Sequence, residues 1–88
     1  MKKELKVKII NNSVLNYFKE HNVPFCKPKD LIPYLIQQGL FKKDYRNGLP
    51  LRNILRELDK NTEVEKLIPS IRIERKKSNR FWFFDKQK

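Results

Sequence analysis

The chain has 88 residues and carries 21 Lys and Arg against 10 Asp and Glu, a net charge of +11. A chain of this length buries only ~60–65% of its unfolded surface, so it forms one modest core without a deep substrate cavity, which argues against most enzymes. The charge indicates an anionic partner, and nucleic acid is the usual one. An anionic membrane surface is the rival partner, and an inert basic surface is the remaining interpretation.

We expect one domain over residues 1–88, with a core over about 5–85. Cys26 is the only cysteine, which excludes an intramolecular disulfide and a metal site of clustered cysteines. No apolar run is long enough for a signal peptide or a membrane span. We therefore expect a cytoplasmic protein with no metal, no cofactor and no membrane partner.

The first predicted element is an amphipathic helix over most of residues 5–21, ended by Pro24. The alternating apolar residues of 5–9 also allow a short strand, with Asn12 or Ser13 capping a shorter helix. The helical interpretation is favoured because six side chains recur at spacings of three and four. They are Val7, Ile10, Val14, Tyr17, Phe18 and His21.

Residues 23–29 are expected to be extended, because two prolines and the residues before them disfavour helix. A second helix is predicted from Asp30, which is a good N-cap. Pro33 then falls at the third helical position, where its missing N–H costs nothing. Gly39 is expected to end this helix as a C-terminal cap.

The third predicted helix follows a polar loop over residues 42–48 and is opened by Pro50. It has the clearest helical pattern in the chain and ends near residues 60–61. Residues 62–70 are expected to form a polar turn that returns two apolar side chains to the core. The helical stripe consists of Leu51, Ile54, Leu55 and Leu58.

The last predicted element is a β-hairpin. Residues 71–74 alternate apolar and charged, and residues 80–84 are β-prone throughout. The turn between them has hairpin length, and Asn79 is able to adopt a left-handed conformation there. Residues 86–88 are expected to form a frayed tail.

Four aromatic residues in a row form the second strand of this hairpin. Because alternate side chains of a strand point to opposite faces, Phe81 and Phe83 share one face and Trp82 and Phe84 the other. One pair is expected to pack in the core, and the other to lie exposed or half-covered by the first helix. We assign Trp82 and Phe84 as the pair available for base stacking or protein contact.

The order of elements resembles the winged helix-turn-helix family, on the segments "CKPKDLIPYLIQQG", "LPLRNILRELDK" and "IRIERKKSNRFWFF". The resemblance implies a mainly α fold with a small β-hairpin (α+β), three helices plus a C-terminal wing. In that family the third helix usually enters the major groove, and the wing reaches the backbone or the minor groove. The loop over residues 42–48 is longer than the family's usual tight turn.

The candidate nucleic-acid-binding residues lie on the third helix, just before it, and in the wing. Arg can form two hydrogen bonds with guanine O6 and N7, and Asn two with adenine N6 and N7. The free N–H groups at the N-terminal end of a helix favour phosphate. The alternatives are a solvated helix face, with Arg52–Glu57 or Arg56–Asp59 pairs, and a plain solubilising turn in the wing. The candidates are Arg46, Asn47, Arg52, Asn53, Arg56 and Lys60, and in the wing Arg75, Lys76, Lys77 and Arg80.

Three functions are compatible with these residues. The first is a DNA-binding regulator or accessory factor. The second is a single-stranded-DNA-binding or polymerase-accessory module, because the chain loosely resembles small stand-alone winged-helix accessory proteins of mobile elements. The third is a protein-interaction module that docks through the aromatic hairpin. We do not expect an enzyme, and we expect either a homodimer or a larger protein partner.

Overall fold

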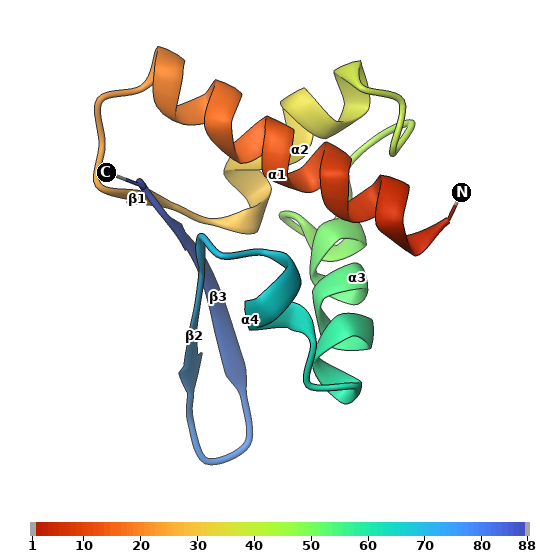
Figure 1. The fold of residues 1–88 in the computed structure, drawn as a ribbon, viewed down its shortest axis with the longest axis vertical. Helices are drawn as coiled ribbons and strands as arrows, with labels where there is room; N and C mark the ends of the chain where they lie inside the picture. The colour runs from red at the N-terminus through yellow and green to blue at the C-terminus, as the bar shows by residue number, and fades with distance from the viewer. Residues whose placement is uncertain (1, 88) are drawn as a thin grey trace.

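The computed structural model describes residues 2–87, which form a small α+β fold. The order of elements along the chain is shown in Figure 1. The helices are α1 (Lys3–Glu20), α2 (Pro28–Gln37), α3 (Leu49–Lys60) and α4 (Val64–Leu67). The strands are β1 (Phe25–Cys26), β2 (Ile71–Arg75) and β3 (Arg80–Asp85).

The three strands form one antiparallel sheet in the order β1-β3-β2. In Figure 1 the β2–β3 hairpin and α3 point in the same direction from the rest of the molecule, with α4 between them. Helix α1 packs on α2, and α2 contacts both α3 and β3. The α2 helix therefore joins the helical layer to the sheet.

Helix α1 is continuous from Lys3 to Glu20, so the helical interpretation is confirmed and the alternative of an initial strand is wrong. Its buried side includes Val7, Ile10 and Val14, as the spacing predicted. His21 caps the helix end from an exposed position, and its ring stacks on Tyr17 with centroids 4.3 Å apart.

The segment after α1 is extended, as predicted, but it also joins the sheet as β1. Phe25 pairs with Asp85 and Cys26 with Phe84. The strand stops after two residues because the chain turns into α2 at Pro28, which has no N–H to donate to a ladder. Membership of the sheet was not predicted from the sequence.

The prediction for the start of α2 is wrong by three residues, because the N-cap is Lys27 and not Asp30. The helix begins at Pro28, and Asp30 lies at its third position, where a carboxylate oxygen accepts the main-chain N–H of Lys27 at 2.8 Å. Pro33 consequently lies inside the helix instead of its first turn. A proline there removes one helical hydrogen bond.

The end of α2 is confirmed at Gly39, which has φ +83°. Its N–H donates to the carbonyl of Ile36 at 3.0 Å, and the N–H of Leu40 donates to that of Leu35 at 2.9 Å. These two bonds form a Schellman motif, in which glycine takes the left-handed position without a steric penalty.

Helix α3 buries Leu51, Leu55 and Leu58, and Ile54 is half-buried, so the predicted stripe faces the core. The segment after it is more ordered than a polar turn. Val64–Leu67 form the helical turn α4, which buries Val64 and leads into the fully buried Ile68. An element of four residues is too short for periodicity to reveal it.

The predicted hairpin is confirmed, with β2 and β3 paired from Ile71↔Phe84 to Arg75↔Arg80. Asn79 does not adopt the expected left-handed conformation; among residues 2–87, the non-glycine residues with positive φ are Arg46, Asn47 and Thr62. The main-chain N–H of Lys76 donates to the Asn79 carbonyl at 2.8 Å and closes the tip.

The face assigned to the aromatic residues of β3 is wrong. Trp82 is 3% exposed and Phe84 is fully buried, so this pair packs in the core, whereas Phe81 is 45% exposed. The reason is that Trp82 and Phe84 share a sheet face with Ile73 and Ile71, their partners on β2, and that face packs against the helices. Trp82 and Phe84 are therefore unavailable for base stacking.

The end of β3 is anchored beyond the strand. Lys86 donates its main-chain N–H to the carbonyl of Pro24 at 3.0 Å, so the expected frayed tail over residues 86–88 is wrong for Lys86, and Lys88 lies outside the described residues.

Within residues 2–87, no helix combines the length and the apolar character needed to cross a membrane.

Candidate nucleic-acid interface

The beginnings of α2 and α3 meet at Gly48. This residue is the N-cap of α3 with φ +91°, and a Cβ built on it would lie 2.7 Å from the main-chain nitrogen of Lys29. Arg46 and Asn47 also have positive φ, at 52° and 53°, so three consecutive residues turn the chain sharply. The Asp44 carboxylate accepts the Gly48 N–H at 3.0 Å and holds this turn closed. Arg46 and Asn47 are thereby brought beside the start of α2.

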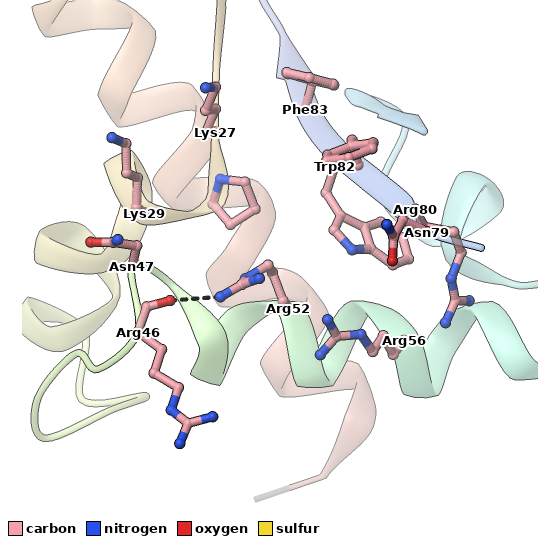
Figure 2. A pocket seen from close by; sticks show the side chains of 12 residues that line it. Lys27, Lys29, Arg46, Asn47, Arg52, Arg56, Asn79, Arg80, Trp82 and Phe83 are labelled. Atoms are coloured by element: carbon pink, nitrogen blue, oxygen red, sulfur yellow. Dashed lines mark hydrogen bonds between the residues drawn. The ribbon is translucent and has the colours of Figure 1, made fainter. Parts of the chain in front are cut away.

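A basic groove of about 480 Å³ follows this junction (Figure 2). Its walls are the start of α2, the turn before α3, one side of α3, and β3 with the end of the hairpin tip. Its lining contains six cationic side chains and no carboxylate. The lining residues are Lys27, Pro28, Lys29, Arg46, Asn47, Arg52, Arg56, Asn79, Arg80, Phe81, Trp82 and Phe83.

Five of the six cations in the groove have no carboxylate within 4.0 Å among the described residues. Gathered like charges repel one another, and an anion bound between them removes that repulsion. This side of the molecule is therefore chemically suited to an anion. We call these five side chains the groove cations: Lys27, Lys29, Arg46, Arg52 and Arg56.

The alternative ion pairs considered for α3 are not formed. Glu57 pairs with Lys60 at 3.5 Å, and Asp59 pairs with the hairpin. Arg52 donates through Nη2 to the Arg46 carbonyl at 2.6 Å. This bond fixes the guanidinium of Arg52 and ties the turn before α3 to the helix.

The four candidate binding residues on α3 do not all face the groove. Arg52 and Arg56 face the groove, whereas Asn53 and Lys60 do not line it. Asn53 lines a shallow depression beside residues 40–45, although its Oδ1 accepts a bond from Arg56 at 3.0 Å. The structure therefore places half of the predicted face in the groove.

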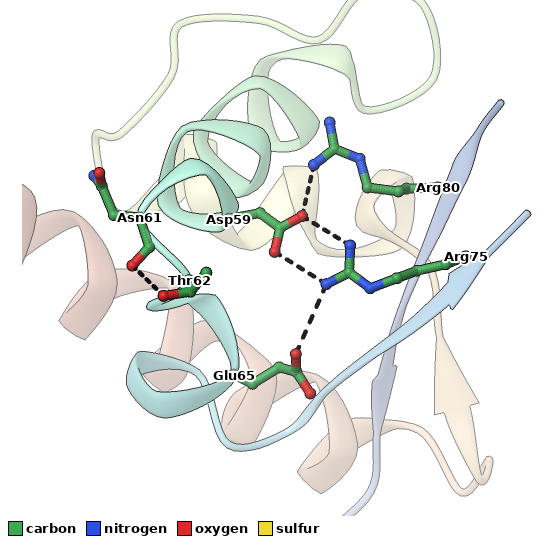
Figure 3. Close-up of polar contacts among 6 residues, drawn as sticks. All are labelled: Asp59, Asn61, Thr62, Glu65, Arg75 and Arg80. Atoms are coloured by element: carbon green, nitrogen blue, oxygen red, sulfur yellow. Dashed lines mark hydrogen bonds and ion pairs between the residues drawn. The ribbon is translucent and has the colours of Figure 1, made fainter.

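Two of the four candidate cations of the wing are already neutralised by an ion pair within the chain. Arg75 and Arg80 both bind Asp59 of α3, as Figure 3 shows. Arg80 donates to it at 2.6 Å, and Arg75 also approaches Glu65 at 3.8 Å. Glu74, which precedes Arg75 in the chain, pairs with Arg72 at 2.7 Å.

The hairpin tip retains two cations without an ion pair among residues 2–87. Lys76 and Lys77 are both exposed, and neither lines the groove. Figure 1 shows the tip at the far end of the hairpin, away from β1. These two lysines thus form a separate positive point on the same hairpin that supplies one wall of the groove.

The arginine bonds to Asp59 have an electrostatic consequence. The side chain is 8% exposed and accepts hydrogen bonds from both arginines. These bonds, that of Arg75 first, hold the pKa of Asp59 below its ordinary value. The carboxylate remains ionised at neutral pH and keeps the hairpin joined to the end of α3.

An exposed aromatic side chain does lie at the groove, but it is not one of the assigned pair. Phe81 lines the groove and is 45% exposed. Phe83 lies next to it on the same sheet face, where the Arg72 guanidinium is 4.6 Å from the ring centroid. The Phe83 ring also meets Phe25 edge-on at 5.7 Å. The aromatic face is thus partly covered by Arg72, and Phe81 remains accessible.

Six residues of the groove were not predicted from the sequence: Lys27, Lys29, Pro28, Asn79, Phe81 and Phe83. The segment "KPK" carries two cations next to a helix N-terminus, and this was a usable signal for the first two. Their approach to α3 depends on the contact at Gly48, which no local pattern reveals.

The chain matches no protein-family model, no curated protein and no solved structure. Its function therefore has to be inferred from the chemistry of the groove.

Proposed function

We propose that this protein binds nucleic acid, with DNA as its partner, through the basic groove between α3 and the hairpin. The observation that carries the proposal is the set of five groove cations without carboxylate partners, in a lining that contains no acid. Lysine and arginine that neutralise backbone phosphates supply most of the affinity of such proteins. The net charge of +11 favours association with a polyanion.

The arrangement of the elements also supports this function. A hairpin follows α3 and lies on one side of the groove, with α3 on the other. This order is the one implied by the resemblance to winged helix-turn-helix proteins, in which helix and wing contact the same nucleic acid. The exposed Lys76 and Lys77 provide a second contact to the backbone at the hairpin tip.

The test is a binding titration with labelled duplex and single-stranded DNA of one sequence at several salt concentrations. If about five phosphates are neutralised, the log–log slope should be about −4.5 for duplex and about −3.5 for single strands. Absence of binding at low salt, or binding that is flat across the salt series, contradicts the proposal.

A matched pair of double variants locates the contact. Lys29→Ala with Arg46→Ala removes two groove cations, whereas Lys19→Ala with Lys66→Ala removes two exposed cations outside the groove. The first pair should weaken binding and make the slope shallower by about two units, and the second should change both much less. Equal losses for the two pairs would mean that charge alone, and not the groove, determines binding.

Phe81 favours single-stranded DNA as a second candidate ligand. An exposed aromatic ring beside cations is the combination that stacks an unpaired base. Phe81→Ala should weaken single-strand binding by about fivefold or more while leaving duplex binding nearly unchanged. If both ligands lose affinity equally, or neither does, Phe81 is not a stacking platform.

A further inference from the structure

Two nitrogen donors on the groove lining are buried without an acceptor. They are Nε1 of Trp82, a residue only 3% exposed, and Nε of Arg52. Both side chains line the groove, and in Figure 2 the indole nitrogen is on the side of the ring that faces Arg52. Buried donors are almost always paired, so each unpaired one requires a physical explanation.

Two further arginines line the groove beside these donors. The Arg80 guanidinium carbon lies 5.4 Å from the centroid of the Trp82 ring, and Arg80 is itself held in place by Asp59. Arg56 lies on the same wall as Arg52, one helical turn further along. An acceptor that satisfies both donors would therefore be favoured if it were an anion.

The adjoining edge of β3 adds main-chain donors. Strand β1 pairs only with Phe84 and Asp85, so the edge from Arg80 to Phe83 is open on that side. Asp85 donates to Ser70, and Lys76 to Asn79, which fixes the alternation of the ladder to β2. By that alternation, the main-chain groups of Trp82 point away from β2, toward the open edge.

We propose that the floor of the groove is a specific site for one phosphate group, which accepts from Nε1 of Trp82 and Nε of Arg52. The inference rests on the proposed function insofar as that phosphate belongs to a nucleic-acid backbone; a free phosphate has the same chemistry. A single fixed phosphate sets the register of the strand in the groove, which diffuse attraction by exposed lysines does not.

The Arg52 side of the site is preorganised. Nη2 of Arg52 is already engaged by the Arg46 carbonyl at 2.6 Å, so the guanidinium is oriented before the ligand arrives. A lysine at this position retains the charge but has no planar fork, and it loses both the tether and the Nε donor. Arg52→Lys therefore separates the directional bond from the charge.

Trp82 is the only tryptophan, so ¹⁵N-labelled protein has a single indole N–H resonance that reports on the site. We would titrate the parent with inorganic phosphate, and then with short single-stranded and duplex DNA at one salt concentration. The expected result is a downfield shift of the indole proton and slower exchange with solvent, both saturating with the ligand.

Two variants test the donors separately. Trp82→Phe keeps an aromatic core residue without the indole N–H, and Arg52→Lys keeps the charge; each should lower DNA affinity by about tenfold. Phe84→Leu changes the neighbouring core without removing a donor, and it should leave affinity nearly unchanged. The indole resonance of the parent needs no substitution, so the test stands even if Trp82→Phe folds poorly.

The outcomes separate this inference from the proposed function. Salt-dependent DNA binding with an unmoved indole resonance overturns the phosphate site and leaves the proposed function in place. A saturable response to phosphate without any DNA binding supports the site and contradicts the proposed function. A response that is identical in Arg52→Lys overturns the role of Arg52 and with it the two-donor site.

Discussion

Arg75 donates from both terminal guanidinium nitrogens to the two carboxylate oxygens of Asp59, each at 3.1 Å. Arg80 donates to the same carboxylate at 2.6 Å, so one acid of α3 holds both strands of the hairpin where its tip begins. Bidentate, charge-assisted bonds of this kind define an orientation as well as a distance. Asp59 therefore fixes the hairpin relative to α3 across the basic groove.

The first prediction concerns the acid sensitivity of this junction. The pKa of Asp59 is below its ordinary value of 3.8, chiefly because of the hydrogen bond from Arg75. A carboxyl whose pKa is depressed by folding contributes stability that is present above the unfolded pKa and is lost as the pH falls through the folded one. Asp59→Asn should therefore melt below the parent at neutral pH, and the difference should shrink below about pH 4.

Thermal melts of both proteins from about pH 7 to about pH 2 check this expectation. The control is Glu57→Gln, which removes an acid that is 72% exposed and paired with Lys60 at 3.5 Å, and which should change the melting temperature little. A difference between parent and Asp59→Asn that is constant with pH would show that the ionised carboxylate is not the stabilising group.

The second prediction separates the two kinds of hairpin cation. Lys76 and Lys77 are exposed without ion pairs among the described residues, so replacing both by alanine should weaken binding to all sequences about equally. It should make the salt slope shallower by up to about two units, with little change in stability. Arg75→Ala should instead lower the melting temperature and leave DNA binding nearly unchanged, because Arg75 is already neutralised by Asp59.

The same DNA panel and salt series are needed for both variants, together with their melting temperatures. If the lysine double variant binds as tightly as the parent at every salt concentration, the hairpin tip is not a nucleic-acid contact. Arg52→Ala belongs in the same panel: an unchanged preference among duplex sequences fits a phosphate contact, whereas an altered preference would indicate that α3 reads bases.

The helical part of the fold could be predicted because it depends on local periodicity. Leu51, Leu55 and Leu58 face the core as their spacing indicates. Strand alternation, in contrast, offers two equivalent solutions for β3, and only packing against the helices decides which face is buried. That is why Trp82 and Phe84 were assigned to the wrong side.

The groove could be predicted only in part, for a similar reason. Arg46, Asn47, Arg52, Arg56 and Arg80 were recognised as candidates from their positions beside helix and turn. The bonds from Arg75 and Arg80 to Asp59 span 16 and 21 residues, and such long-range pairing leaves no sequence pattern.

The third prediction tests which side of α3 faces the core and which faces the groove. Leu55 is fully buried, and Leu55→Ala should lower the free energy of unfolding by ~2–5 kcal/mol, because it removes core contacts and leaves a cavity. Arg56→Ala should leave the melting temperature nearly unchanged and weaken DNA binding, since Arg56 lines the groove. Urea unfolding and a DNA titration on both variants check this pair, and reversed effects would refute the facing.

The fourth prediction concerns the buried thiol of Cys26. Burial, followed by the charges of Asp30 and Asp85, raises its pKa to about 12, and the residue is 2% exposed. Because the thiolate is the reactive form, a disulfide reagent at neutral pH should modify the native protein very slowly. Modification should accelerate in denaturant. Rapid reaction of the folded protein would mean that β1 opens readily from β3.

The fifth prediction compares the two glycines of the chain, Gly39 and Gly48. Both have positive φ, so alanine at either position incurs the left-handed penalty of ~1–2 kcal/mol. A Cβ at Gly39 meets nothing within 4 Å, whereas at Gly48 it would lie 2.7 Å from the main-chain nitrogen of Lys29. Gly48→Ala should therefore destabilise the fold by more than Gly39→Ala.

Binding should distinguish the two glycine variants more sharply than stability does. Main-chain atoms cannot rotate away as a side chain can, so Gly48→Ala must separate the start of α3 from the start of α2. That separation moves Lys29 relative to Arg46 and Arg52, which together line the groove. DNA affinity should fall for Gly48→Ala under conditions where both variants are fully folded, and it should be unchanged for Gly39→Ala. Equal affinities for the two variants would mean that the contact at Gly48 maintains the fold without shaping the binding surface.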